Sequence, residues 1–170
     1  MKIAIGADHG GFDLKKSIKA FLKKEKYQIK DFGTFSPKSC DYPLIAYKVA
    51  SRVASGEFDR GVLICKSGMG MCMVSNKVPG IRAALLCGVK NARLSREHNN
   101  ANIAVFSGGS ISMSKAKEIL KVWLTASFAG GRHARRIGQI ERIEEKIKEG
   151  KTTLGEFCKA LKEEPQEGGR

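Results

Sequence analysis

The sequence predicts an α/β protein in which helices cover both faces of a five-stranded parallel sheet. Short apolar runs alternate with helical patterns along the chain, which is typical of βαβ units. Two of the runs, 62–65 and 83–87, are apolar at successive positions, so we expect them to be central strands covered on both faces. The 170 residues suit one ordinary globular domain.

The individual elements follow from this alternation. The predicted strands are residues 2–7, 28–32, 61–65, 81–87 and 102–106. The predicted helices after them are residues 12–25, 44–55, 69–77, 89–99 and 114–128. In the first helix, Leu14, Ile18 and Leu22 recur at helical spacing, and the lysines fall outside this apolar stripe. Pro43 suits the first turn of the second helix.

A further amphipathic helix is expected after Gly130 and Gly131. Its apolar stripe, which needs a surface to cover, consists of Ile137, Ile140, Ile143 and Ile147. We assign residues 1–149 to one α/β domain. Residues 150–170 form a C-terminal extension that we expect to be partly helical or frayed.

The charge of the chain favours anionic partners. Lysine and arginine number 31 against 17 acidic residues, a net charge of +14. Nucleic acid, acidic membranes and phosphorylated metabolites all fit such a charge. The alternative is that many lysines only solvate helix faces, among them Lys15, Lys16, Lys19, Lys23 and Lys24. Because no RNP motif, helix-turn-helix signature or aromatic stacking platform accompanies the charge, we expect no nucleic-acid partner.

The cysteines and the N-terminus indicate a reducing compartment. Five cysteines form no CxxC pair and are odd in number, which indicates neither a disulfide framework nor a zinc site, so we expect no metal. Asp8 interrupts the first apolar run before a signal peptide could develop, and no segment approaches 18 uncharged apolar residues. We therefore expect a cytoplasmic protein with no membrane partner.

Polar and flexible residues follow four of the five predicted strands. Ligands of open parallel sheets bind beyond the carboxyl ends of the strands, so these positions are the candidates for a site. They are Asp8 and His9 after the first strand, the loop from Cys65 to Gly70 after the third, His98 and Asn99 on the helix after the fourth, and residues 107–110 after the fifth. We expect a cysteine, two histidines and two glycine-containing loops to converge on one edge of the sheet.

Cys65 is the candidate base or nucleophile, because a helix N-terminus and basic neighbours both favour a thiolate. The alternative is a small buried hydrophobic residue, like Cys87 at an analogous strand end. The loop that follows Cys65 opens a helix, where unpaired backbone N–H groups make an anion site for a phosphate or a developing enolate. Alternatively, its glycines only form a tight turn.

The remaining candidates also have structural alternatives. Asp8 caps the next helix in one interpretation, and His98 is a structural hydrogen-bonding residue. Together with Cys65 and Ser67, they supply the base, acid and hydroxyl that proton transfer next to a carbonyl requires. Three arginines at 132, 135 and 136 either bind a phosphate or form the solvated start of a basic helix.

Six separated motifs resemble the ribose-5-phosphate isomerase B family, which also includes galactose-6-phosphate and allose-6-phosphate isomerases. They cover about residues 1 to 145, in order and at the family's spacing. The motifs are Asp8-His9-Gly10-Gly11-Phe12, Asp41-Tyr42-Pro43, Leu63-Ile64-Cys65-Lys66-Ser67-Gly68-Met69-Gly70, Asn76-Lys77 with Gly80-Ile81-Arg82-Ala83, His98-Asn99-Asn100-Ala101-Asn102 and Gly130-Gly131-Arg132-His133.

The resemblance implies a Rossmann-like fold and cofactor-free isomerisation of an aldose phosphate to a ketose phosphate through an enediolate, with ribose 5-phosphate and ribulose 5-phosphate as the expected pair. It implies that Cys65 is the base between C1 and C2, and that Ser67 and His98 assist ring opening. The substrate-binding residues that it implies are Asp8, His9, Lys66, Gly68, Met69, Gly70, Asn99, Arg132 and Arg136. It also implies a homodimer or a dimer of dimers, with the arginine helix at a neighbour's active site.

Two residues depart from the pattern of this family. Lys66 stands where the family usually has glycine, and Gly109 stands where it usually has arginine. The alternatives are therefore an isomerase of a hexose 6-phosphate, allose or galactose, and a catalytically weak paralogue that only binds a phosphorylated sugar.

Overall fold

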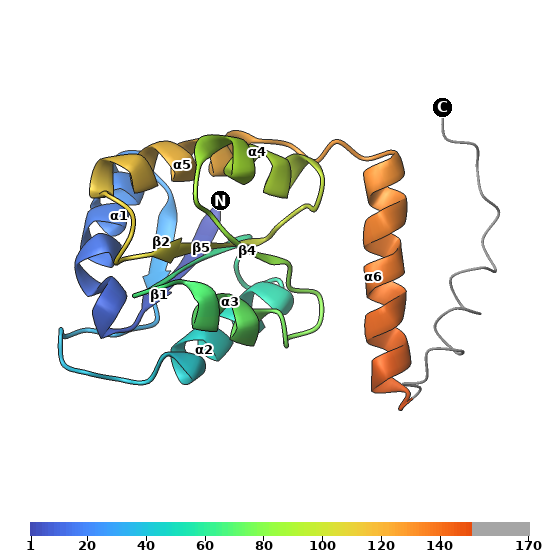
Figure 1. The fold of residues 1–170 in the computed structure, drawn as a ribbon, viewed down its shortest axis with the longest axis horizontal. Coiled ribbons are helices and arrows are strands. Elements are labelled where there is room, and N and C mark those ends of the chain that lie inside the picture. The colour runs from blue at the N-terminus through green and yellow to red at the C-terminus, as the bar shows by residue number, and fades with distance from the viewer. Residues whose placement is uncertain (151–170) are drawn as a thin grey trace. The chain divides into compact units, whose positions relative to one another are not determined.

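A computed structural model describes residues 1–150, which fall into two compact units, residues 1–128 and the chain from residue 129 on (Figure 1). The strands of the first unit are β1 (Lys2–Ala7), β2 (Gln28–Asp31), β3 (Arg60–Cys65), β4 (Ala83–Leu85) and β5 (Ile103–Ser107). Its helices are the short 3-10 helix η1 (His9–Gly11), α1 (Phe12–Lys24), α2 (Tyr42–Ala54), α3 (Met69–Ser75), α4 (Val89–Glu97) and α5 (Met113–Thr125). The second unit contains α6 (Arg132–Lys148).

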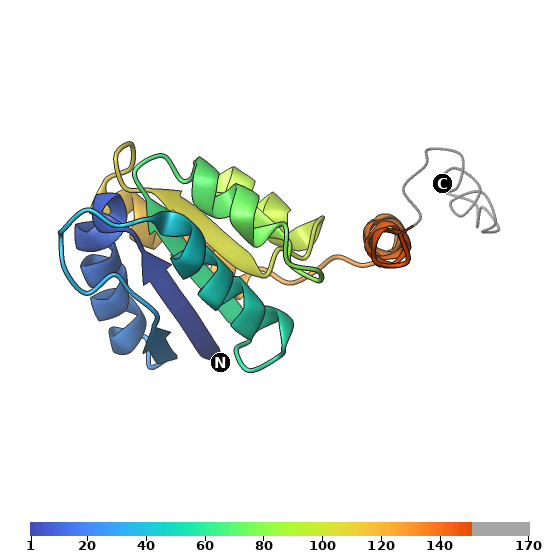
Figure 2. The ribbon, with the colours of Figure 1, turned by 90° about the horizontal axis from the view of Figure 1, so that it is seen from below.

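The predicted α/β architecture is confirmed. All five strands are parallel, in the order β2-β1-β3-β5-β4. One apolar core lies between the sheet and α1, α4 and α5, and a second lies between the opposite face and α2 and α3 (Figures 1 and 2). Along β1, Ile3 and Ile5 enter the first core while Ala4 enters the second, as the alternation of a strand requires.

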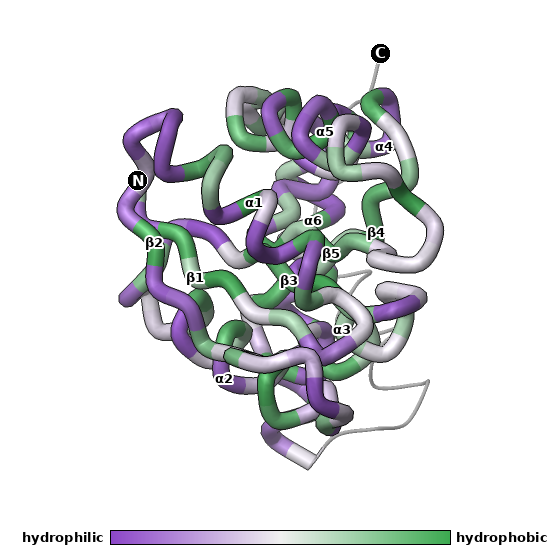
Figure 3. Tube along the Cα trace, turned by 90° about the vertical axis from the view of Figure 1, so that its left-hand side faces the viewer, coloured by the Kyte–Doolittle hydropathy of each residue, from purple (hydrophilic) through white to green (hydrophobic). Residues whose placement is uncertain are grey.

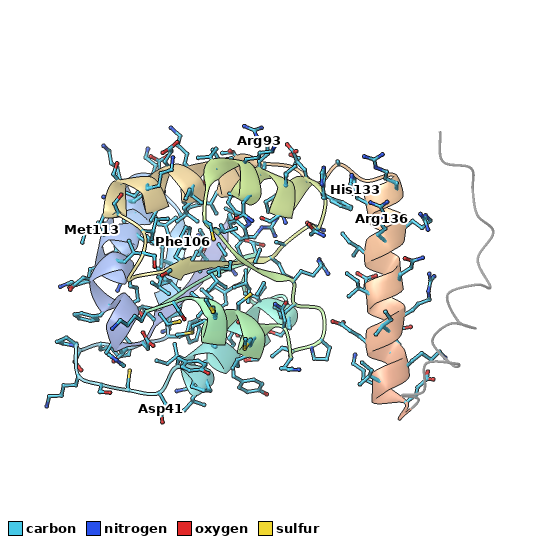
Figure 4. The ribbon with its side chains drawn as sticks, in the orientation of Figure 1. Asp41, Arg93, Phe106, Met113, His133 and Arg136 are labelled. Atoms are coloured by element: carbon cyan, nitrogen blue, oxygen red, sulfur yellow. The ribbon has the colours of Figure 1, made fainter. Side chains whose placement is uncertain are left out.

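The inner strands are apolar because both of their faces are covered. Coloured by hydropathy, they form the hydrophobic centre of the first unit, and hydrophilic stretches lie on the surrounding helices (Figure 3). Phe106 on β5 is fully buried between the layers (Figure 4). The run 62–65 belongs to β3, the middle strand of the five, as expected.

The prediction of a second central strand at 83–87 is wrong. β4 is only three residues long and lies at the edge of the sheet. Its apolar character has another cause, because Ala84 packs against one core while Ala83 and Leu85 pack against the other. The run is apolar because helices cover both faces of β4. Its place at the edge follows from the strand order, in which β4 pairs only with β5. Cys87 lies beyond this strand and is exposed, so it is not the buried residue that served as an alternative for Cys65.

The second unit contains the amphipathic helix expected after the glycine pair. In α6, Ile137 is buried, while Ile140 and Ile147 are exposed. The C-terminal extension from residue 151 lies outside the described residues, so the predicted boundary at 149 stays a prediction. Within residues 1–150, no helix is long and apolar enough to cross a membrane.

Candidate active site

Cys65 ends β3, the middle strand, at the carboxyl edge of the sheet. Only 4% of the residue is exposed, and its Sγ accepts a hydrogen bond of 3.1 Å from the backbone N–H of Gly68. That N–H reaches back to the sulfur because Gly68 adopts a φ of +79°, a left-handed conformation that favours glycine. The sulfur is therefore held at the start of the loop by a backbone donor of that loop.

The loop after Cys65 is fastened to the end of β5. The carbonyl of Lys66 accepts hydrogen bonds from Ser107 Oγ at 2.7 Å and from the Gly109 N–H at 2.9 Å. Ser67 Oγ accepts the Met69 N–H at 3.4 Å. Within the described part of the chain, the N–H groups of Ser67 and Gly70 donate no hydrogen bond. Two backbone donors of the predicted anion loop are therefore available to a ligand.

Asp8 and His9 form the turn after β1, beside this loop. Asp8 is 6% exposed, and its Oδ1 accepts the N–H of Gly11 at 3.1 Å, so its side chain caps η1. His9 Nδ1 lies 3.2 Å from the backbone nitrogen of Cys40 and 3.3 Å from its carbonyl oxygen. The imidazole is therefore held by the loop that follows β2.

A buried ion pair that the sequence did not predict supports the loop after β2. Lys15 on α1 is 1% exposed, so it is not one of the solvating lysines. Its Nζ lies 2.7 Å from Asp31 Oδ1 and donates to the carbonyl oxygen of Thr34 at 2.6 Å, while Lys19 Nζ lies 2.5 Å from Asp31 Oδ2. Burial lowers the pKa of Lys15. Burial acts to raise the pKa of Asp31, but the bonds from both lysines outweigh it and hold that pKa below its usual range.

A cavity of about 280 Å³ adjoins the reactive loop. It is lined by Ser67, Met69, Leu85, Leu86, Cys87, Ser107, Ser110 and Ile111. A larger, more open hollow of about 760 Å³ follows α4 from Cys87 to Asn99. We place the candidate site at the smaller cavity, because it contains Ser67 and adjoins the end of β5 that fastens the Cys65 loop.

The expectation that His98 and Asn99 share an edge with Cys65 in one chain is wrong. Because α4 connects parallel strands, it runs back across the sheet and ends at the amino edge. There the carbonyl of Asn102 accepts the Gly61 N–H at 2.9 Å. Gly61 and Cys65 are four residues apart on β3, which corresponds to about 13 Å of strand. The two halves of the predicted catalytic set therefore lie at opposite edges.

The arginines predicted to bind phosphate lie on the second unit. Arg132 and Arg136 are both exposed and are one helical turn apart on α6. This spacing brings two guanidinium groups to one face of the helix. Figure 4 labels Arg136 and its neighbour His133.

Within residues 1–150, no group of three His, Cys, Asp or Glu side chains could hold a metal ion.

Lys66 fits its position because glycines flank it. A Cβ on Gly10 would lie 2.9 Å from Lys66 Cβ, and a Cβ on Gly109 would lie 2.9 Å from the Lys66 carbonyl oxygen. Lys66 is exposed, and its ammonium forms no ion pair with any described residue. The close contact of Gly109 is with the backbone of residue 66, whereas the Lys66 side chain would lie 3.4 Å from that Cβ, and the loop keeps its tight turn with an exposed cation at its rim.

Comparison with known proteins gives one consistent result. Residues 3–140 match the family described as Ribose/Galactose Isomerase. The chain is 43% identical to the ribose-5-phosphate isomerase B of Escherichia coli K12, over 85% of this chain and 97% of that protein. A solved ribose-5-phosphate isomerase B of Clostridium thermocellum is 51% identical, with a TM-score of 0.85 over 86% of this chain and 99% of that one. The Mycoplasma genitalium enzyme, solved with bound ribulose-5-phosphate, is 41% identical, with a TM-score of 0.83 over 85% and 97%.

Proposed function

Because the chain belongs to the Ribose/Galactose Isomerase family, we propose that it interconverts ribose 5-phosphate and ribulose 5-phosphate without a cofactor. The observation that carries this proposal is the Cys65 sulfur, held by the Gly68 N–H at the carboxyl edge of the sheet. The similar Mycoplasma genitalium enzyme binds ribulose-5-phosphate, which supports the choice of a five-carbon substrate.

Cys65 acts as the base in the proposed reaction. The thiolate takes the proton from C2 of the open-chain aldose, and the electron pair of that C–H bond forms a C1–C2 double bond. The former carbonyl oxygen at C1 becomes an enediolate oxygen, which the available N–H groups of the 66–70 loop stabilise. The thiol then returns the proton to C1. The proton of the C2 hydroxyl passes to the C1 oxygen, so C2 becomes the carbonyl, C1 carries the hydroxyl, and the thiolate is regenerated. No net oxidation occurs, so no cofactor is required.

The other residues of the predicted set bind the sugar or open its ring. Ser67 and His98 assist ring opening, and Asp8, His9 and Asn99 contact the substrate hydroxyls. Residues Lys66, Gly68, Met69 and Gly70 shape the anion loop around the reacting carbons. Arg132 and Arg136 bind the phosphate dianion, a task to which the bidentate guanidinium is suited.

The active site requires two copies of the chain. His98 and Asn99 lie at the opposite edge of the sheet from Cys65, so one chain cannot bring them to one substrate. In a twofold dimer, the carboxyl edge of one copy faces the amino edge of the other, and both sites are completed together. The exposed isoleucines of α6 supply an apolar surface for such an assembly. We propose a homodimer or a dimer of dimers.

A substrate panel tests the reaction, with ketose formation measured for ribose 5-phosphate, allose 6-phosphate and galactose 6-phosphate. We expect the highest specificity constant for ribose 5-phosphate, and Cys65→Ala should lower its turnover by about 10²- to 10⁴-fold. The control is Cys87→Ala, because Cys87 is an exposed cysteine that lines the same cavity but is outside the predicted catalytic and binding set. If Cys65→Ala kept more than a tenth of the wild-type turnover, Cys65 would not be the base.

Two alternative functions have specific support. The family includes galactose isomerases, so a hexose 6-phosphate is the second candidate substrate. The Lys66 and Gly109 departures favour a paralogue that binds a sugar phosphate with little turnover. A higher specificity constant for a hexose would establish the first, and saturable binding without ketose formation would establish the second.

A further inference from the structure

Arg96 on α4 is a buried cation that forms no ion pair with any described residue. Only 4% of it is exposed. Burial, together with the charges of Arg60 and Arg82, lowers the pKa of Arg96 to about 10, so the guanidinium still carries its charge at neutral pH. Buried charges are normally paired because their desolvation is unfavourable. An unpaired one therefore requires an explanation in its other contacts.

The guanidinium is fixed by uncharged partners. Its Nη1 donates to Asn100 Oδ1 and to the carbonyl oxygen of Ala101, both at 2.7 Å. The guanidinium carbon lies 5.9 Å from the ring centre of Trp123, which is fully buried on α5. The cation thus ties the end of α4 to the core.

These bonds determine the shape of the turn that carries His98 and Asn99. His98 caps α4, and two residues later Asn100 has a φ of +45°, which reverses the chain. Asparagine tolerates this left-handed region better than other non-glycine residues, and its side chain and carbonyl are then free to be fixed by neighbouring donors. Arg96 holds the Asn100 side chain, and Arg82 Nε donates to the Asn100 carbonyl oxygen at 3.2 Å.

We infer that Arg96 is a positioning residue for the ring-opening half of the reaction, which acts through His98 and Asn99 and does not touch the substrate. This inference rests on the proposed function. It assigns a role to a buried arginine outside the predicted catalytic and binding set. The inference also predicts that two steps of the reaction respond differently to a change at Arg96. Ring opening and sugar binding at the amino edge should be affected, whereas proton transfer at Cys65 should not.

The chemistry of ribulose 5-phosphate allows these steps to be measured separately. A five-membered ring of this ketose would need the C5 oxygen, which carries the phosphate, so the sugar is open-chain. Exchange of its C1 proton with deuterated water therefore requires the base but no ring opening. Isomerisation of ribose 5-phosphate requires both steps.

The test uses Arg96→Met in the full chain, with Arg93→Met as the matched control. Arg93 lies on the exposed side of the same helix, one turn earlier (Figure 4). We expect Arg96→Met to lower kcat/KM for ribose 5-phosphate by about 100-fold, because a displacement of about 1 Å has such an effect. C1 exchange in ribulose 5-phosphate should fall much less. Arg93→Met should change neither rate.

A double-variant comparison distinguishes positioning from a general structural role. In a background of His98→Asn and Asn99→Ala, Arg96→Met should cause little further loss, because the groups through which it acts are already gone. Losses that multiply, or an equal fall in exchange, would overturn the inference. If Arg96→Met does not fold, Asn100→Gly gives the same comparison, because glycine tolerates the φ of +45° but lacks the acceptor.

The results that would overturn the proposed function differ from those that would overturn only the role of Arg96. A wild-type chain that forms no ribulose 5-phosphate, or a Cys65→Ala variant with full exchange, would overturn the proposed function and this inference with it. An active wild type and an inactive Cys65→Ala variant, combined with an unaffected Arg96→Met variant, would overturn the inference alone.

Discussion

Lys66 offers a direct test of how this chain binds the substrate phosphate. Its ammonium is exposed at the rim of the Cys65 loop and forms no ion pair with a described residue, so it is free to meet an anion. Lys66→Met removes the charge but keeps a flexible stem of similar length between Gly10 and Gly109. A charge-assisted hydrogen bond is worth about 1.5 to 3 kcal/mol. Its loss should lower kcat/KM for ribose 5-phosphate by about 10- to 150-fold.

The assay is ketose formation at low ionic strength and at about 0.3 M salt. The effect of Lys66→Met should shrink at high salt, because screening weakens an exposed charge pair. Lys24→Met, on the exposed end of α1, controls for the change in net charge. The melting temperature should not change, because the lysine head is solvated. A specificity constant within twofold of wild type at low salt would refute phosphate binding by Lys66.

Two further predictions concern stability and loop shape. Asp31→Asn leaves Lys15 buried without its counterion and should lower the free energy of unfolding at pH 7 by about 3 to 5 kcal/mol. The pKa of Asp31 in the folded state lies below its usual value, so the Asp31 carboxylate stabilises the fold at a pH above its unfolded-state pKa. This stabilisation is lost as the pH falls through the folded-state pKa. The free energy of urea unfolding should therefore depend less on pH in the Asn variant than in the wild type below about pH 4. Gly68→Ala would place a Cβ 2.3 Å from Leu85 Cδ1 at a φ of +79°, so we expect lower turnover and a stability loss of about 1 to 3 kcal/mol by thermal unfolding. Gly88→Ala, with no atom within 4 Å of its added Cβ, should change neither, and an unaffected Gly68→Ala variant would show that the loop is not constrained as described.

Local patterns in the sequence predict the elements of the fold well, because the spacing of apolar residues in a segment indicates which of its side chains are buried. The alternation of apolar runs and helical stripes identifies all five strands and all six α-helices of the described residues, with ends that differ by a few residues. The position of β4 could not be predicted in this way. Its apolar run reports that both faces are covered, whereas its place at the sheet edge depends on which strands pair.

The candidate site was predicted in part, for a similar reason. Asp8 directly follows β1 and Cys65 is the last residue of β3, so the rule for carboxyl ends places them correctly. His98 lies at the far end of a connecting helix, and the antiparallel course of that helix carries it to the other edge. The length of the predicted helix at 89–99 could have indicated this, because a helix of that length spans the sheet and places its last residues at the opposite edge.

The buried cations had no signal in the sequence. Lys15 lies on α1 with four other lysines, and its burial against Asp31 and the carbonyl of Thr34 is a tertiary contact that the sequence of the helix does not indicate. Arg96 likewise resembles its neighbour Arg93 in a charged helix. Its role depends on contacts with Asn100 and Trp123, which come from a turn and from a different helix.

In the proposed dimer, each active site combines the carboxyl edge of one chain with the amino edge of another. Co-expression of Cys65→Ala and His98→Asn chains with different affinity tags, followed by isolation of doubly tagged dimers, tests it most directly. Each parent dimer has two defective sites, whereas every mixed dimer contains one site with both an intact cysteine and an intact histidine. We predict that the mixed dimer isomerises ribose 5-phosphate at about half the wild-type rate per dimer. A mixed dimer no more active than its parents would contradict the claim and would place both residues in the site of a single chain.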